Sequence, residues 1–166
     1  MKMKRMKYYA SLFSALFVIG QVCAQPSLDF NDIKEINSES SFLRVFLENG
    51  FEKVRHGDII VEVGYNYDSY PSEYLTTATY YPKASCFEIY FYEPFWNGRQ
   101  TNNYESLVSQ IKDCNFSATY EGSEFNEDVT FLLYSCPTSK YAGKIGYSLV
   151  SSDGAKWGVI KTFPFK

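Results

Sequence analysis

The chain has 166 residues, of which 45% are hydrophobic and 19% aromatic. This length supports one domain with its own core, and the composition is not that of a disordered or collagen-like chain. Acidic side chains outnumber basic ones by 19 to 16, and no cluster of lysine or arginine follows the first seven residues, which argues against nucleic-acid binding.

The first 24 residues have the layout of a secretory signal peptide. Residues 1–7 carry lysine and arginine without any acid, an apolar run follows, and the small residue Ala24 ends the segment. This pattern predicts cleavage after Ala24 and a secreted or periplasmic protein of residues 25–166. The apolar run is too short to cross a membrane as a helix, so no transmembrane segment is expected. Lipid attachment at Cys23 is an alternative, although the residues before it fit a lipoprotein signal poorly.

Two helical segments are expected next. Residues 27–37 read as a short helix, and residues 38–49 as a better one, capped by Ser38 or Ser40 and ended by Gly50. The apolar stripe of the second helix has the spacing of one helix face: Leu43, Phe46 and Leu47.

Strands follow over residues 58–67 and 85–93, because apolar and polar residues alternate there, and over residues 76–81, which are rich in threonine and tyrosine. Alternation places Phe87, Ile89 and Phe91 on one face of the last strand. Its other face then carries the following side chains: Cys86, Glu88, Tyr90 and Tyr92.

After a turn-rich linker at residues 94–100, the second half repeats this plan. A helix beginning near Asn103 carries an apolar stripe that ends in Cys114. Residues 121–128 read as a solvated loop, residues 129–136 as a strand with Phe131 and Leu133 facing the helices, and residues 144–151 and 156–163 as a hairpin turned by Asp-Gly. The expected core also includes these residues: Leu43, Phe46, Leu47, Ile59, Val61, Val63, Leu107, Val108, Ile111, Ile145, Leu149, Trp157 and Val159.

These elements predict an α+β domain with an antiparallel sheet of about six to eight strands and two main helices packed on one face. Residues 38–94 and 101–166 follow one plan of helix and then strands, which raises a tandem duplication as a hypothesis. The layout resembles that of secreted β-lactamase inhibitory proteins, whose tandem helix-plus-sheet repeats offer a concave sheet to a partner enzyme. No residue role is carried over from that architectural resemblance.

The sequence offers little for catalysis. His56 is the single histidine, so a zinc site made of several histidines is excluded, and no phosphate-binding glycine motif is present. Glu62 and Glu88 are expected on the open face of the sheet, where two carboxylates could hydrolyse a glycosidic bond. Since carboxylates are common on a wet sheet face, a protein without enzymatic activity, metal or cofactor is the favoured interpretation.

Tyrosine is unusually frequent, with 15 residues in the chain, and its amphipathic ring suits binding surfaces. The sequence therefore predicts an inhibitor-like or immunity-type binding protein with a basic protein partner. A small-molecule or glycan-binding module is the alternative. The predicted binding residues lie on the open sheet face and its edge: Tyr90, Tyr92, Tyr134, Glu88, Glu62, Phe95 and Trp96.

Three cysteines follow the predicted leader, so at most one disulfide can form within the chain. Cys86 and Cys136 both point to the open side by alternation and could pair if their strands are neighbours. Cys114 shares the apolar stripe of its helix and is expected to be a buried thiol.

Overall fold

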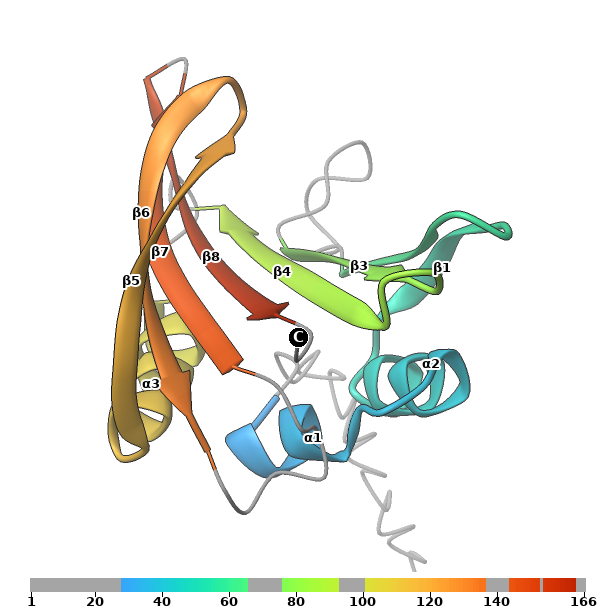
Figure 1. The fold of residues 1–166 in the computed structure, drawn as a ribbon. Helices are drawn as coiled ribbons and strands as arrows, with labels where there is room; N and C mark the ends of the chain where they lie inside the picture. Colours follow the sequence, from blue (N-terminus) through green and yellow to red (C-terminus); the bar gives the residue numbers. More distant parts are fainter. Residues whose placement is uncertain (1–27, 66–75, 93–100, 137–143, 153, 164–166) are drawn as a thin grey trace, which may run out of the picture.

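The computed structural model describes residues 28–65, 76–92, 101–136, 144–152 and 154–163. They form one antiparallel sheet of eight strands with helices on one face, which confirms the α+β prediction (Figure 1). The predicted leader 1–24 lies outside the described residues. The first half contains α1 (Phe30–Glu35), α2 (Glu39–Glu48), β1 (Glu52–His56), β2 (Val61–Tyr65), β3 (Thr76–Tyr81) and β4 (Cys86–Tyr92). The second half contains α3 (Thr101–Lys112), β5 (Asn115–Glu124), β6 (Glu127–Ser135), β7 (Lys144–Ser152) and β8 (Ala155–Phe163).

The strand order is β1-β2-β3-β4-β8-β7-β6-β5. In each half a helix, α2 or α3, is followed by a meander of four strands, and the two meanders join through their last strands, where Ile89 pairs with Ile160. This topology agrees with the plan of two similar halves. A duplication of residues 38–94 and 101–166 stays a hypothesis.

The boundaries of α2 follow from its capping residues. The Ser38 side chain accepts a hydrogen bond from the Ser41 N–H, and the Ser41 side chain accepts one from the Ser38 N–H. The two bonds form a capping box. Gly50 ends the helix at φ +83°, and Phe51 donates its N–H to the Phe46 carbonyl at 3.0 Å. The predicted start and end of this helix are confirmed.

The main core lies between the helices and one face of the sheet. Phe46, Phe87 and Ile111 are fully buried in it, together with most of the expected stripe residues. Three expected core residues are instead exposed: Leu47, Ile59 and Leu149. Ile59 lies in the turn before β2, since that strand begins only at Val61, and the helix α2 packs through Phe42 and Val45 rather than through Leu47.

A second core lies on the opposite face, because the long β5–β6 hairpin curls back over the sheet (Figure 1). Phe131 and Leu133 of β6 point into this core, so the prediction that they face the helices is wrong. Leu132 and Tyr134 lie on the helical side instead. Alternation correctly predicted which residues of β6 share a face. It could not predict which face points toward the helices, because both faces of β6 carry apolar residues.

The sequence prediction missed both edge strands. Every residue of β1 is exposed, and most of β5 is exposed, so neither strand shows the alternation of a half-buried strand. The stretch 121–128, expected as a loop, forms the end of β5, a two-residue turn and the start of β6.

The disulfide prediction was also wrong. Cys114 and Cys136 are bonded, with their Cα atoms 5.1 Å apart, and Cys86 is a free thiol. Strand β4, which carries Cys86, is separated from β6 by β8 and β7. Cys136 directly follows β6, whose last residue pairs with Asn115 beside Cys114. The bond therefore ties the end of α3 to the base of the β5–β6 hairpin.

Counting thiols tests this pairing. The denatured, unreduced protein should show one reactive thiol per chain, Cys86, once the leader is removed, and a leader that is kept would add Cys23. Replacing Cys114 and Cys136 together by serine should lower the free energy of unfolding by about 3 kcal/mol, because the unfolded chain loses the loop constraint. Three thiols in the processed protein would contradict the bond.

A second prediction concerns the docking of α3. Its Tyr104 ring lies on Gly158 of β8, where an added Cβ would come within 2.7 Å of the ring, and its hydroxyl donates to the Ser148 carbonyl at 2.7 Å. Gly158→Ala should displace the ring and destabilise the fold by about 1–3 kcal/mol in a denaturant titration. Gly57→Ala is the control, because the nearest atom to its new Cβ is 3.8 Å away. Equal stability of the two variants would contradict the close packing.

Candidate binding site

The tip of the β5–β6 hairpin has an unusual turn. Glu124 pairs with Glu127, so Phe125 and Asn126 form a two-residue loop, with φ angles of +53° and +64°. These angles are typical of a type I′ turn, in which asparagine and glycine are preferred. A phenylalanine at positive φ is an outlier that the surrounding structure must stabilise.

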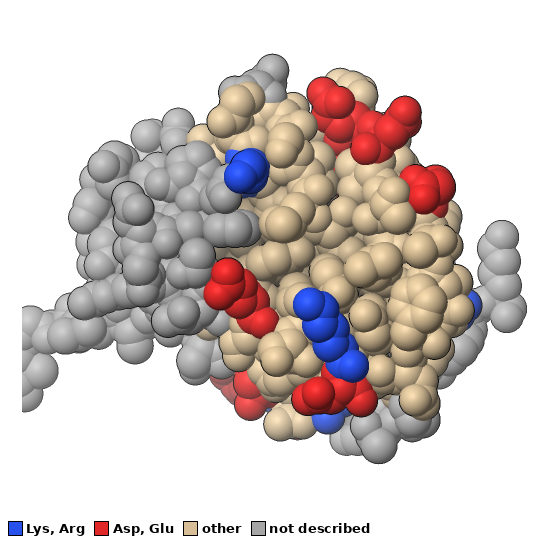
Figure 2. Space-filling view, turned by 90° about the vertical axis from the view of Figure 1, so that its left-hand side faces the viewer, with Lys and Arg blue, Asp and Glu red and all other residues tan. Residues whose placement is uncertain are grey.

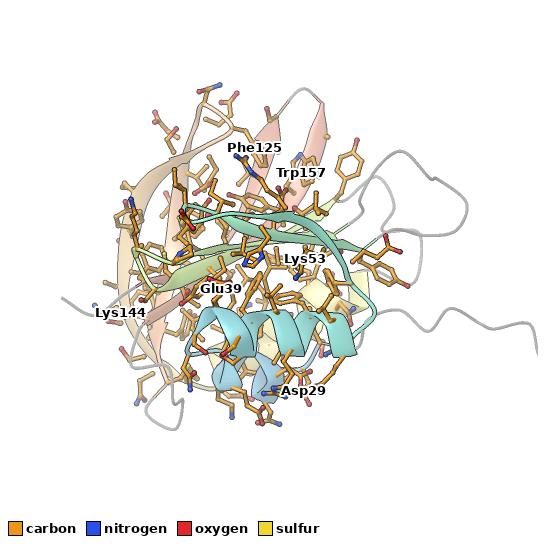
Figure 3. The ribbon with its side chains drawn as sticks, turned by 90° about the vertical axis from the view of Figure 1, so that its right-hand side faces the viewer. Asp29, Glu39, Lys53, Phe125, Lys144 and Trp157 are labelled. Atoms are coloured by element: carbon orange, nitrogen blue, oxygen red, sulfur yellow. A yellow bond between two sulfur atoms is a disulfide. The ribbon has the colours of Figure 1, made fainter. Side chains whose placement is uncertain are left out.

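Aromatic packing supplies that support. The Phe125 ring lies 5.3 Å from the ring of Tyr90 and 5.3 Å from that of Trp157, and Trp157 lies 4.4 Å from Tyr92. Figure 3 shows Phe125 and Trp157 close together at the same end of the molecule. We call Tyr92, Phe125 and Trp157 the rim cluster. Tyr92 and Trp157 are half-buried and Phe125 is 44% exposed, so the cluster presents aromatic surface to solvent.

A buried charge network lies beneath the rim cluster. The Lys161 ammonium group is 2.7 Å from Glu124 and 3.0 Å from Glu88. The Tyr90 hydroxyl donates to the second oxygen of Glu124 at 2.6 Å, and the Tyr81 hydroxyl donates to the second oxygen of Glu88. Each carboxylate oxygen therefore has a donor, which satisfies two carboxylates that are 6% and 8% exposed.

The network keeps its tyrosines as hydrogen-bond donors. Burial raises the pKa of Tyr90, and the negative charges of Glu88 and Glu124 raise it further. Burial and the hydrogen bond to Glu88 raise the pKa of Tyr81 in the same way. Burial opposes the charge of Lys161, but its two carboxylate partners outweigh this effect, so its pKa is also raised. Lys161 is therefore cationic at neutral pH.

The predicted binding residues are only partly brought together. Glu62, Glu88, Tyr90 and Tyr92 share one sheet face, as alternation indicated, because Glu62 and Glu88 both pair with Thr79. Glu88 is buried under the hairpin tip rather than exposed, and Tyr90 is bound within the network. Tyr134 lies on the opposite face, stacked on Tyr147 at 5.9 Å. Phe95 and Trp96 lie outside the described residues.

Sequence reasoning missed the residues that complete the site. Phe125 and Glu124 belong to the stretch interpreted as a solvated loop, and Lys161 and Trp157 come from the distant strand β8. The one available signal was a phenylalanine among acidic residues, since a solvated loop rarely needs an aromatic side chain.

The only histidine has a structural contact. His56, at the end of β1, lies 2.7 Å from Glu39 at the start of α2 and is about half exposed. Among the described residues, no group of three or more metal-ligating side chains is placed to hold an ion. No helix in that part of the chain is long and apolar enough to cross a membrane.

Comparison with known proteins does not assign the chain to a family. No protein-family model, no curated protein and no solved structure matches it.

The charge network should hold the hairpin tip in place. Lys161→Met would leave two neighbouring carboxylates without their shared cation, so we expect the free energy of unfolding to fall by about 2–3 kcal/mol. We also expect faster hydrogen exchange at the end of the β5–β6 hairpin. Lys53→Met, at an exposed position of the edge strand β1, should change stability by about 0.5 kcal/mol or less. Equal effects of the two variants would show that the network does not hold the hairpin.

Proposed function

We propose that the protein is an exported binding protein that recognises another protein through the rim cluster, in the manner of an inhibitor or immunity factor. The observation that carries this proposal is Phe125, an exposed aromatic residue held at positive φ. A turn selected only for folding would carry asparagine or glycine there. Strain retained at an exposed position suggests a role outside the fold.

The surroundings of the cluster suit a protein surface. Aromatic residues that are rigidly packed and half exposed are enriched at the centres of interfaces. Tyr92, Phe125 and Trp157 support one another, so little side-chain freedom would be lost on binding.

Charge indicates the chemistry of the partner. Glu127 and Asp128 follow the turn and are exposed, and acidic atoms gather at the upper edge of the view in Figure 2, at the height of the hairpin tip in Figure 1. Residues 25–166 carry a net charge of 12 − 19 = −7. A partner with an apolar centre and a basic rim fits this surface.

A non-enzymatic role agrees with the state of the acidic side chains. The carboxylates of Glu88 and Glu124 accept hydrogen bonds from groups within the fold. Groups held in this way stabilise the hairpin rather than offering a proton to a substrate.

The alternative is a small-molecule or glycan-binding module. A groove of about 290 Å³ lies between α3 and strands β6 and β7, which is slightly below the usual volume of ligand pockets. The neighbouring rings of Tyr92 and Trp157, tilted by 32° to one another, could also hold a sugar. A change in tryptophan fluorescence on titration with oligosaccharides, lost in Trp157→Phe, would favour this alternative.

Three matched baits test the protein-binding proposal: the wild type, Phe125→Gly and Ile59→Ser. Phe125→Gly should keep the fold within about 1 kcal/mol, because glycine relieves the turn while ring packing is lost. Ile59→Ser removes another exposed apolar side chain, in the turn before β2. The partner should be retained by the wild type and Ile59→Ser, and lost with Phe125→Gly.

Affinity measurements with the purified partner then decide the site. Phe125→Gly should weaken binding about 30-fold, or about 2 kcal/mol, and added salt should weaken wild-type binding. Equal affinity of the wild type and a folded Phe125→Gly variant would contradict the rim cluster as the binding site.

A further inference from the structure

The two edges of the sheet are protected very differently. The edge strand β1 has five residues, an irregular register and four ionisable side chains, Glu52, Lys53, Arg55 and His56. Short, charged and irregular edge strands resist pairing with another chain. This edge has the features of one that stays unpaired.

The other edge strand, β5, lacks most of this protection. It is ten residues long and contains no lysine, arginine or proline. Its register shifts once, between Phe116 and Ala118, and from Ala118 onwards its pairing with β6 is regular. Within the described part of the chain, β6 is its only strand partner. Of its two acidic residues, Glu124 is buried in the network and Glu121 accepts a hydrogen bond from Thr130.

We propose that β5 pairs with β5 of a second copy of this chain, antiparallel and around a two-fold axis at Tyr120. A two-fold axis perpendicular to the sheet keeps each side chain on its own face of the sheet. One residue of β5 must therefore lie directly opposite the same residue of the second copy, with the axis between the two. Tyr120 is the position that keeps the paired stretch clear of both the register shift and the hairpin tip. Two eight-stranded sheets would join into one continuous sheet.

The side chains of β5 are compatible with this self-pairing. Tyr120 would face Tyr120 of the second copy, and aromatic pairs directly across two strands are favourable. Thr119 would face Glu121 of the second copy, so a hydroxyl group meets the one exposed carboxylate of strand β5. Ala118 would face Gly122, where the strands can approach closely. No two like charges lie directly opposite in this register.

Exposure supports the same edge. Tyr120 is 47% exposed, with its ring 5.2 Å from Phe163, and Phe116 is 58% exposed. Figure 2 shows the side of the molecule on which β5 lies, and a broad area there has neither acidic nor basic side chains. Two copies could therefore approach along this edge without strong charge repulsion, despite the negative net charge.

Sedimentation equilibrium over a wide range of protein concentration tests the proposal directly. The wild-type protein should be a reversible dimer. Tyr120→Lys places two positive charges across the axis and should raise the dissociation constant of the dimer at least about tenfold. Ser151→Lys, at an exposed position of the inner strand β7, adds the same charge and should leave the dimer unchanged.

A cysteine at the axis provides an independent geometric test. Opposite residues of antiparallel strands have Cα atoms about 4.5–5.5 Å apart, a distance that a disulfide can span. In a Cys86→Ser background, Tyr120→Cys should cross-link to its own copy on mild oxidation, and Ser151→Cys should not. This readout holds even if Tyr120→Lys is poorly folded.

A monomeric wild type at all concentrations would overturn the proposal. A dimer that withstands Tyr120→Lys, or a Tyr120→Cys variant that fails to cross-link, would also overturn it. These measurements need no binding partner, and Phe125 is not altered in them. Their failure would therefore leave the rim-cluster proposal standing, and loss of that proposal would leave the dimer untouched.

Discussion

The ion pairs of Lys161 with Glu88 and Glu124 are the interaction on which the second half of the fold depends. Among the described residues, three helices cover one face of an eight-stranded sheet, so the other face needs a cover of its own. The β5–β6 hairpin supplies it by curling back and burying Val129, Phe131 and Leu133. Because burying carboxylates is unfavourable unless all their oxygens are satisfied, this arrangement requires Lys161 and the two tyrosine hydroxyls together. The network thus specifies one position for the hairpin tip.

That position places Phe125 against Tyr90 and Trp157 in a conformation that its own backbone disfavours. The same contacts explain how the strain is tolerated, since ring packing and the charge network both act on adjacent residues of one turn. The strain and its compensation are therefore local. A change in the turn residue would alter the exposed surface and leave the residues of the second core unchanged, so the proposed binding can be tested separately from folding.

Local sequence patterns predicted much of the fold, but they did not predict the contacts between residues that are distant in the sequence. Ser38 and Gly50 gave the limits of α2, and the alternation of Phe87, Ile89 and Phe91 gave the inner face of β4. Alternation could not orient β6, because both of its faces are covered by apolar groups. The burial of Glu88 and the bond between Cys114 and Cys136 depend on strand order and hairpin curvature, which no short stretch of sequence encodes. The candidate site was therefore predicted only where it lies on β4, at Glu88, Tyr90 and Tyr92.

The two halves share an order of helix and strands, but their edge strands differ in charge and in length. The first half ends its sheet in the charged strand β1, which His56 ties to α2 through Glu39. The second half has an uncharged edge along most of β5, and its hairpin tip carries the strained phenylalanine. The disulfide between Cys114 and Cys136 ties the base of this hairpin to the end of α3. The edge proposed for self-pairing and the tip proposed for partner binding are thus two separate surfaces of one hairpin. Assembly through the edge would leave the tip free for a partner.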